Sequence, residues 1–185
     1  MLYHLDTSGR LSEGLVIPLA QNTLSVFGRN YVDKFHRHGV FKSLQNGDVN
    51  ACLDSLDSST FREFALELFR LHHPSVSGLQ LPSRLCSFFA TRNIEDALRY
   101  AERHEYQGEI RIFEVNVEGE HPHFDMTWLD RVFPKRIDAD ISYYLHKYWT
   151  GKLFETDPHL AQADPRPSMC EYLVARTATI GRRVS

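Results

Sequence analysis

Helix patterns and strand patterns alternate irregularly along this chain, and that order restricts the fold more than any other feature. The strand patterns predict strands at 2–5, 86–90, 109–117 and 169–181, with an edge or loop piece at 15–21. The helix patterns predict a helix from Thr60 to a stop at His72, His73 and Pro74, a helix after Asn93 and a helix at 139–149. The pattern has no regular strand–helix–strand period and no glycine-rich turn after a strand, which disfavours a doubly wound nucleotide-binding fold. We therefore expect an α+β fold.

Two of the predicted helices have marked beginnings. Thr60 and Glu63 predict a capping box, and Asn93 predicts an N-cap that is followed by Glu95 in the first turn. Tyr100 lies at the edge of the apolar stripe of the second helix. We expect its side chain to project into a neighbouring cleft.

The two late strands depart from simple alternation. The strand at 109–117 changes phase between Ile112 and Phe113, which predicts a bulge or burial on both faces. In the strand at 169–181, Glu171 shares a face with Leu173, the face expected to be buried. A buried carboxylate is unfavourable unless a partner or a cleft lies beside it, so Glu171 is a candidate functional residue.

The length and composition fit one globular domain that spans residues 1–185. The chain has a net charge of −3 and 42% hydrophobic residues, which gives no overall basic field for nucleic-acid binding. The three cysteines are widely spaced and predict neither a metal site nor a disulfide framework. No segment resembles a membrane span or a signal peptide, so we expect a cytoplasmic protein without membrane contacts.

The usual catalytic and metal motifs do not account for the polar residues. The histidine pairs at 36 and 38 and at 72 and 73 lack a third ligand at zinc spacing, so we expect no metal. The sequence contains no GxSxG, HExxH or phosphate-binding glycine loop, so these signatures give no support to a hydrolase or a P-loop enzyme.

Three short stretches together resemble the ADP-ribosyltransferase superfamily, in particular its His–Tyr–Glu branch. They are LYHL with His4, the run SFFA (87–90) leading to Tyr100, and EYLV headed by Glu171. In that family a histidine on an early strand opens the site, an aromatic strand runs into a helix with a tyrosine, and a glutamate at the start of a late strand completes it. The resemblance implies an ADP-ribosyltransferase-like split mixed sheet with flanking helices.

The resemblance also implies an activity. Such a protein would be an NAD-dependent mono-ADP-ribosyltransferase, a glycosyltransferase that moves ADP-ribose from NAD to a macromolecular acceptor, either nucleic acid or protein. Relatives include bacterial toxins and antiphage defence enzymes, so an antitoxin or inhibitor is a further candidate partner. Met169 stands where arginine-modifying members carry a Gln or Glu, which leaves the acceptor open, and Leu5 replaces the glycine that follows the histidine in polymerase-type members.

The resemblance gives each catalytic candidate a role. Cleavage of the nicotinamide–ribose bond passes through an oxocarbenium-like state, which the carboxylate of Glu171 would stabilise. Tyr100 would stack on nicotinamide together with an aromatic residue of the strand, for which we favour Phe89. His4 would donate to a ribose hydroxyl and orient NAD.

Further residues are candidates for contacts with NAD. Arg84 and Arg92 flank the aromatic strand and could bind the diphosphate through their planar guanidinium groups. Thr7, close to His4 in sequence, is a candidate lining residue.

Two other functions remain open. An NAD-consuming RNA 2′-phosphotransferase would resemble this branch but would need a dense set of basic residues to grip RNA. A non-catalytic interaction domain could retain the scaffold, with His4 and Glu171 in structural roles. The segments 22–57 and 118–168 match no pattern that favours one of these functions.

Overall fold

The computed structural model describes residues 1–20, 22–47, 50–131, 133, 135–136 and 138–185. Its strands are β1 (Leu2–Leu5), β2 (Val16–Ile17), β3 (Phe88–Ala90), β4 (Ile112–Asn116), β5 (His123–Asp125), β6 (Cys170–Val174) and β7 (Ala178–Arg183). Its helices are α1 (Val26–Arg37), α2 (Val40–Gln45), α3 (Asn50–Leu53), α4 (Ser58–His72), α5 (Pro74–Ser77), α6 (Ile94–Arg103) and α7 (Ala139–Trp149), with short 3₁₀ turns η1 (Arg84–Cys86), η2 (Met126–Leu129) and η3 (Phe154–Thr156). Gln21, the last residue of the piece predicted at 15–21, lies outside the described residues.

The strands form two antiparallel sheets that meet at one bridge. The four-stranded sheet has the order β1-β4-β7-β2 and the three-stranded sheet the order β3-β6-β5. All strand pairs in the described part of the chain are antiparallel, and a bridge between Tyr3 and Thr91 joins β1 to β3. The α+β expectation is confirmed.

The expectation of a mixed sheet is wrong for the described residues. Helices between strands can indicate crossovers between parallel strands, but the connections through α6 and α7 join no parallel pair among the described residues. The connection through α6 passes from β3 to β4 in the other sheet, and the connection through α7 returns the chain so that β6 pairs antiparallel with β5.

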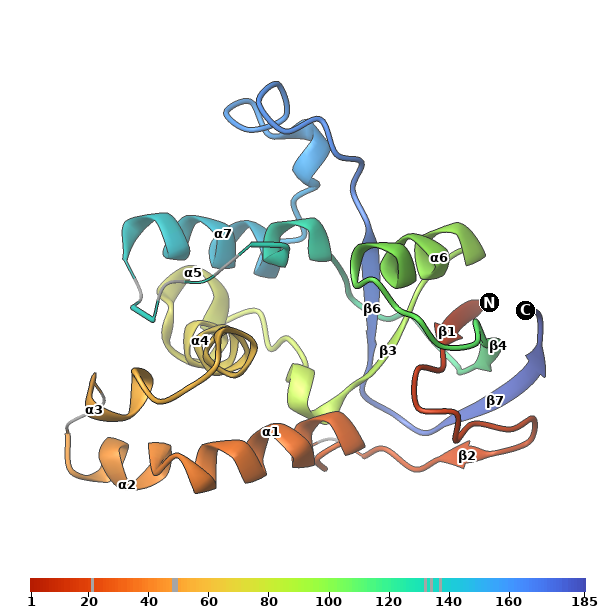
Figure 1. Ribbon diagram of the computed structural model, residues 1–185, viewed down its shortest axis with the longest axis horizontal. Helices are drawn as coiled ribbons and strands as arrows, with labels where there is room; N and C mark the ends of the chain where they lie inside the picture. The colour runs from red at the N-terminus through yellow and green to blue at the C-terminus, as the bar shows by residue number, and fades with distance from the viewer. Residues whose placement is uncertain (21, 48–49, 132, 134, 137) are drawn as a thin grey trace.

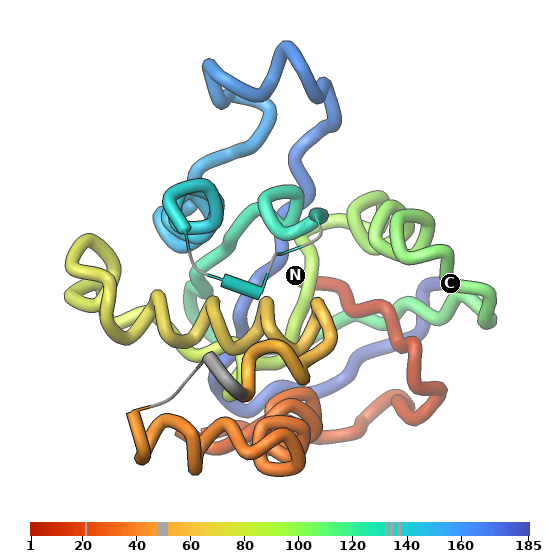
Figure 2. The backbone as a smooth tube through the Cα atoms, turned by 60° about the vertical axis from the view of Figure 1, so that its left-hand side comes forward, coloured from red at the N-terminus to blue at the C-terminus, as the bar shows by residue number. Residues whose placement is uncertain are grey.

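Most of the helices lie on one side of the molecule, and the four-stranded sheet lies on the other. In Figure 1, α1 to α5 and α7 lie on one side, and the four-stranded sheet with α6 lies on the other. The strands β3 and β6 run between them. Figure 2 shows the same division from another direction, with the loop between α7 and β6 projecting from the body.

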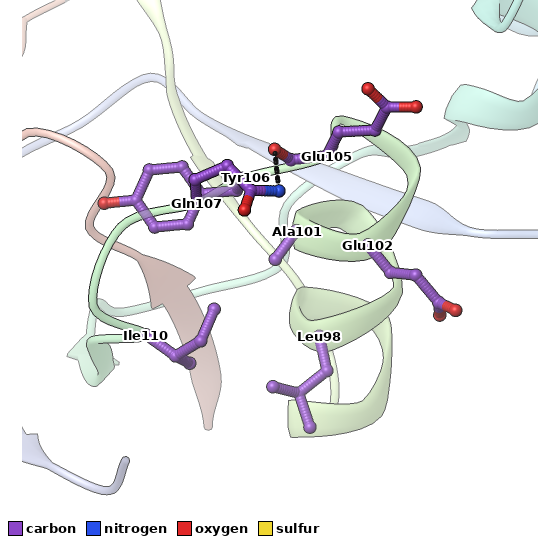
Figure 3. A pocket seen from close by; sticks show the side chains of 7 residues that line it. All are labelled: Leu98, Ala101, Glu102, Glu105, Tyr106, Gln107 and Ile110. Carbon is purple, nitrogen blue, oxygen red and sulfur yellow. Dashed lines mark hydrogen bonds between the residues drawn. The ribbon is translucent and has the colours of Figure 1, made fainter.

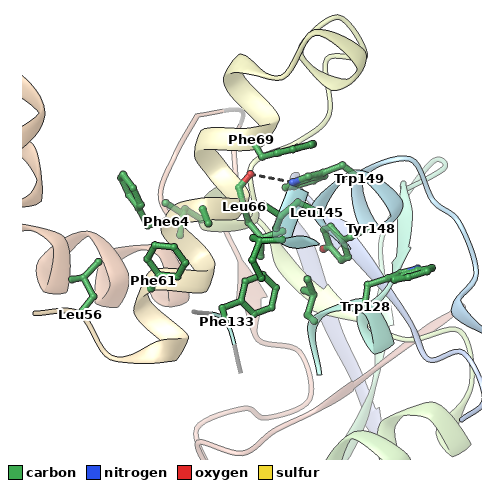
Figure 4. Close-up of a cluster of buried hydrophobic side chains, with 14 of the residues drawn as sticks. Leu56, Phe61, Phe64, Leu66, Phe69, Trp128, Phe133, Leu145, Tyr148 and Trp149 are labelled. Carbon is green, nitrogen blue, oxygen red and sulfur yellow. Dashed lines mark hydrogen bonds between the residues drawn. The ribbon is translucent and has the colours of Figure 1, made fainter. Parts of the chain in front are cut away.

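The main hydrophobic core lies on the helical side. Figure 4 shows rings from α4, α7 and η2 packed together, among them Phe61, Trp128, Tyr148 and Trp149, all of which are fully buried. The indole nitrogen of Trp149 donates a hydrogen bond to the carbonyl of Leu66 at 3.0 Å. This core holds α4 and α7 together beside the three-stranded sheet.

The strand predicted at 169–181 is two strands, so that expectation is wrong. The chain leaves the three-stranded sheet after Val174 and enters the four-stranded sheet at Ala178. Gly181 does not end the second strand but lies inside β7, where a Cβ would come within 2.9 Å of the Glu114 side chain. A strand pattern can therefore continue across a change of sheet.

The expectation of a bulge or of burial on both faces in the strand at 109–117 is confirmed in the shorter strand β4, where the register shifts one step later than the predicted change of phase. In β4 the residues from Ile112 to Val115 are all buried, and the register to β7 shifts between Phe113 and Val115.

The predicted start of the helix at Thr60 is wrong. Asp57 is the N-cap of α4, and its side chain accepts from the backbone N–H of Thr60 at 2.8 Å. Glu63 takes no part in a capping box because its carboxylate accepts from Arg84 instead. The helix ends at His72, as predicted.

Several helices lie in segments for which the sequence patterns gave no element. Within 22–57 the structure has α1, α2 and α3, and α5 (Pro74–Ser77) follows the predicted stop of the helix that begins at Ser58. Ser25 caps α1, and Phe27, Tyr31 and Phe35 form an aromatic stripe along that helix. This i, i+4, i+8 stripe was a detectable helix signal.

Among the described residues, no helix combines the length and the apolar character needed to cross a membrane.

The packing of α1 on η1 leads to a first prediction. A Cβ added at Gly28 would overlap the backbone carbonyl group of Leu85, which cannot rotate away. Gly28→Ala should therefore lower the free energy of unfolding by about 1–3 kcal/mol, although alanine favours helices. Urea unfolding measures the effect, with Gly78→Ala as control because a Cβ there meets open space. A midpoint unchanged by Gly28→Ala would contradict the close packing.

A second prediction concerns Asp157, whose carboxylate accepts from Tyr143 and Lys147 at 2.7 Å each. Burial raises the pKa of Asp157, but these hydrogen bonds outweigh it and lower the pKa to about 2. Since the folded pKa lies below the unfolded value, the stabilisation is present above about pH 4 and is lost as the pH falls towards the folded pKa. Asp157→Asn should therefore destabilise the protein at neutral pH and have much less effect near the folded pKa. Thermal unfolding across this range provides the check, and an effect independent of pH would argue against the ion pair.

Candidate functional site

Glu171 is a buried carboxylate in the second position of β6. It pairs with Phe124 of β5 and has only 3% of its surface exposed. Alternation along β6 puts it on the same face as Leu173, which pairs with Phe89 of β3. The predicted burial of Glu171 and Leu173 on one face is confirmed.

Arg84 and Tyr148 are the direct partners of Glu171. The Nη1 group of Arg84 donates to Glu171 Oε1, and the hydroxyl of Tyr148 donates to the same oxygen at 2.6 Å. The Nε group of Arg84 also donates to Glu63 Oε2 at 2.8 Å. The guanidinium group lies 4.8 Å over the ring of Phe89. We call Glu63, Arg84, Tyr148 and Glu171 the buried cluster.

The buried cluster contains one arginine and two carboxylates. Burial disfavours the cation of Arg84, but Glu171 and Glu63 outweigh that effect and hold the pKa of Arg84 well above its usual value. Burial raises the pKa of Glu171, and the nearby Glu63 adds to this effect. Because Arg84 is shared, it compensates each carboxylate only in part.

The local chain around η1 fixes the position of Arg84. Its backbone N–H donates to Glu67 Oε1 at 2.8 Å, so α4 holds both the backbone and the side chain of Arg84. The next residue, Leu85, accepts from the backbone N–H and the hydroxyl of Ser25, at 2.9 and 3.1 Å. Two helices far apart in sequence therefore set the position of the arginine.

Tyr100 lies on α6 and is half-buried, as its position at the edge of the stripe predicted. Its ring packs against His104 at 4.3 Å between centroids. Burial raises the pKa of Tyr100, and the charge of Glu171 raises it further. The ring of Tyr100 packs beside the apolar cluster of Leu5, Ala97, Ala101 and Ile112, on the helix that follows β3, the strand paired with β6.

The side chain of His4 lies on the opposite side of β3 from the buried cluster. Its Nδ1–H donates to the carbonyl of Phe89 at 2.7 Å, and its ring packs on Phe88 at 4.2 Å. Phe88 and Phe89 point to opposite faces, so His4 lies on the side opposite Glu171. Burial lowers the pKa of His4. The structure thus does not bring His4 close to the side chains of Tyr100 and Glu171. Instead, the hydrogen bond and the ring contact of His4 connect β1 to β3.

The remaining candidates divide in the same way. Phe89 lies on the Glu171 side, in contact with Arg84 and with the ring of Phe27 at 4.8 Å. Thr7 and Arg92 are exposed, in the turn after β1 and in the connection from β3 to α6. Nothing in the described residues brings Thr7 or Arg92 to Glu171.

Glu63 and Tyr148 belong to the buried cluster but were not singled out from the sequence. Both lie on the buried faces of helices, where the sequence pattern indicates a cap residue for Glu63 and a core residue for Tyr148. A signal was present for Tyr148, because a tyrosine at the centre of an apolar stripe must find a partner for its hydroxyl. Glu63 gave a similar signal, since it stands between Phe61 and Phe64 on a buried helix.

Two surface hollows lie away from the buried cluster. One, of about 450 Å³, lies between α6 and the segment before β4 and is lined by Leu98, Ala101, Tyr106 and Ile110 among others. Figure 3 shows these side chains. Another of about 860 Å³ lies beside β4 and β7 and includes Asn116, Arg176 and Thr179. Neither is lined by Tyr100 or Glu171. No group of three or more metal-ligating side chains occurs in the described residues.

The antiparallel α+β fold and the buried cluster do not by themselves define a known class of enzyme. The chain belongs to a family described as a protein of unknown function (DUF2441), whose model matches residues 2–160. The match includes His4, Arg84 and Tyr100, and it ends before Glu171. No curated protein matches the chain.

Proposed function

We propose that the protein is an NAD-dependent mono-ADP-ribosyltransferase that modifies a macromolecule, nucleic acid or protein. The observation that supports this proposal is the pairing of β3, the strand that leads into α6, with β6, the strand that carries Glu171. The family resemblance assigns the nicotinamide-stacking role to Tyr100 on α6 and the transition-state role to Glu171 on β6. The strand with His4 adjoins the same aromatic strand β3 through the bridge between Tyr3 and Thr91.

The chemistry assigned to the site is a group transfer at the ribose C1′ of NAD. The bond from C1′ to the nicotinamide nitrogen breaks, and its electron pair leaves with neutral nicotinamide. A nucleophilic atom of the acceptor forms the new bond to C1′ and gives up its proton. Glu171 accepts a hydrogen bond from a ribose hydroxyl and stabilises the positive charge that develops on the sugar.

The proposal requires that NAD gain access to Glu171, which is buried in this structure. Glu171 Oε1 is bonded to Arg84 and Tyr148 and is nearly inaccessible. NAD must therefore displace side chains around Glu171, in exchange for hydrogen bonds from the ribose. Arg84 then acts as a positioning residue for Glu171, in place of the diphosphate role expected from the sequence.

The experiment is transfer of label from NAD. The protein is incubated with NAD labelled in the adenylate phosphate and with cell lysate, and the product is treated with nuclease or protease to identify the acceptor class. Glu171→Gln should abolish most of the transfer, whereas the exposed Glu120→Gln should leave it unchanged. Equal labelling by Glu171→Gln and wild type would refute the role of Glu171.

A second candidate is a non-catalytic interaction domain. It is favoured by the burial of Glu171 and by its hydrogen bonds to Arg84 and Tyr148, which together form a satisfied structural network. Calorimetry with NAD distinguishes the two candidates. Heat of binding at millimolar NAD supports the enzyme, and its absence supports the interaction domain.

A further inference from the structure

Arg62 is an arginine at the rim of the buried cluster, outside the stretches that carry the family resemblance. It precedes Glu63 on α4, and 24% of its side chain is exposed. Its Nε group lies 3.4 Å from Glu63 Oε1, and its Nη1 group lies 3.4 Å from the carbonyl oxygen of Leu129. Both distances exceed the usual range for N–H···O hydrogen bonds.

The other arginines nearby are held more firmly. Arg84 is buried and bonded to two carboxylates. Arg103 donates to Asp130 at 2.7 Å, to Thr127 at 3.1 Å and to the carbonyl of Pro167 at 3.0 Å. Of these three guanidinium groups, that of Arg62 loses least when it turns to a new anionic partner.

The position of Arg62 connects it to the helix that carries Tyr100. Its contact at the Leu129 carbonyl is one residue from Asp130, which pairs with Arg103 on α6. The electrostatics agree with this placement. Burial and Glu171 raise the pKa of Tyr100 while Arg62 opposes them, and Arg62 adds to the burial that lowers the pKa of His104.

We infer that Arg62 binds a phosphate of the NAD diphosphate next to Tyr100, an inference that rests on the proposed function. A planar guanidinium can donate two parallel hydrogen bonds to a phosphate. The carboxylate of Glu63 competes weakly for Arg62, because Glu63 is bonded to Arg84 at 2.8 Å. Arg62 therefore binds the diphosphate, the role for which Arg84 was a candidate from the sequence.

The test is calorimetric binding of ADP-ribose to Arg62→Ala, Arg62→Lys and wild type. Loss of a charge-assisted hydrogen bond predicts about ten- to a hundredfold weaker binding by Arg62→Ala. Arg62→Lys, which keeps the charge but not the planar fork, should fall between the two. Nicotinamide, which has no phosphate, should bind wild type and Arg62→Ala equally. The control is Arg99→Ala on α6, which removes one positive charge from an arginine paired with Asp96.

The outcomes separate this inference from the proposed function. Equal ADP-ribose affinity of wild type and Arg62→Ala overturns the inference, even if label transfer still depends on Glu171. An equal loss in Arg62→Ala and Arg99→Ala also overturns it, because the effect would be that of net charge. Affinity that depends on Arg62, without label transfer that depends on Glu171, supports the phosphate site and refutes the catalytic role. No binding of ADP-ribose to wild type refutes both.

Discussion

Arg84→Met is expected to destabilise the protein by about 3–5 kcal/mol at neutral pH, as removal of one partner from a buried ion pair does. The substitution preserves most of the side-chain volume but leaves Glu63 and Glu171 buried without their cation. Tyr148 still donates to Glu171, but one neutral hydrogen bond compensates little for the lost charge.

The pH dependence of Arg84→Met identifies the cause. Burial already raises the pKa of Glu171, and without Arg84 nothing positive opposes that rise, so the variant gains stability as the pH falls and Glu171 takes up a proton. Unfolding by urea at about pH 5 and pH 8 should show a smaller difference from wild type at the lower pH. Adding Glu63→Gln and Glu171→Gln to the variant should recover part of the loss at pH 8. A loss that is equal at both pH values and is not recovered would show that shape, not charge, is the main contribution of Arg84.

Trp149→Ala is expected to cost about 3–5 kcal/mol, the range for truncation of a large buried aromatic residue. Trp149 is 1% exposed and packs against Phe124 and Tyr148, with ring centroids at 5.2 and 5.0 Å. Its loss opens a cavity between α4 and α7 and removes the hydrogen bond to the Leu66 carbonyl.

Trp149→Phe is the matched control, because it keeps a ring in the core but cannot donate to Leu66. It should lose much less stability than Trp149→Ala in thermal or urea unfolding. If the two variants unfold at the same midpoint, the hydrogen bond to Leu66 rather than the packing is the main contribution. A midpoint of Trp149→Ala close to wild type would contradict the core described for the helical side.

The elements with strong local signals could be predicted from the sequence. The strand with His4, the helix with Tyr100 and the helix at 139–149 occur where the patterns put them, and the aromatic strand predicted at 86–90 is shorter, since Cys86 ends a 3₁₀ turn and β3 begins at Phe88. Their caps and apolar stripes are local, so neighbouring residues suffice to reveal them.

Strand direction and sheet membership could not be predicted, because they depend on distant partners. The residues from 169 to 181 keep a strand pattern although the chain changes sheets between Val174 and Ala178. The start of α4 was misplaced for a different reason. Asp57 and Thr60 are both good capping residues, and the actual partner of Glu63 is Arg84, 21 residues away along the chain.

The candidate site was predicted in part. Burial of Glu171 followed from alternation, and Phe89 lies on the same side, in contact with Arg84. The side of β1 on which His4 lies could not be predicted, because it depends on how β1 meets β3 at a single bridge. The role of Arg84 depends on contacts with α4, α7 and β6, which no local pattern contains.

The catalytic role of Glu171 is tested most directly by the rate of nicotinamide release from NAD, measured in the presence of lysate for wild type and Glu171→Gln. Glu63 still balances Arg84 in this variant, so it should fold, and circular dichroism verifies that both proteins are compared in the folded state. Glu171→Gln should release nicotinamide about 10²–10³-fold more slowly, the effect of removing one electrostatic group that stabilises a transition state. Equal rates for the two folded proteins would contradict this role.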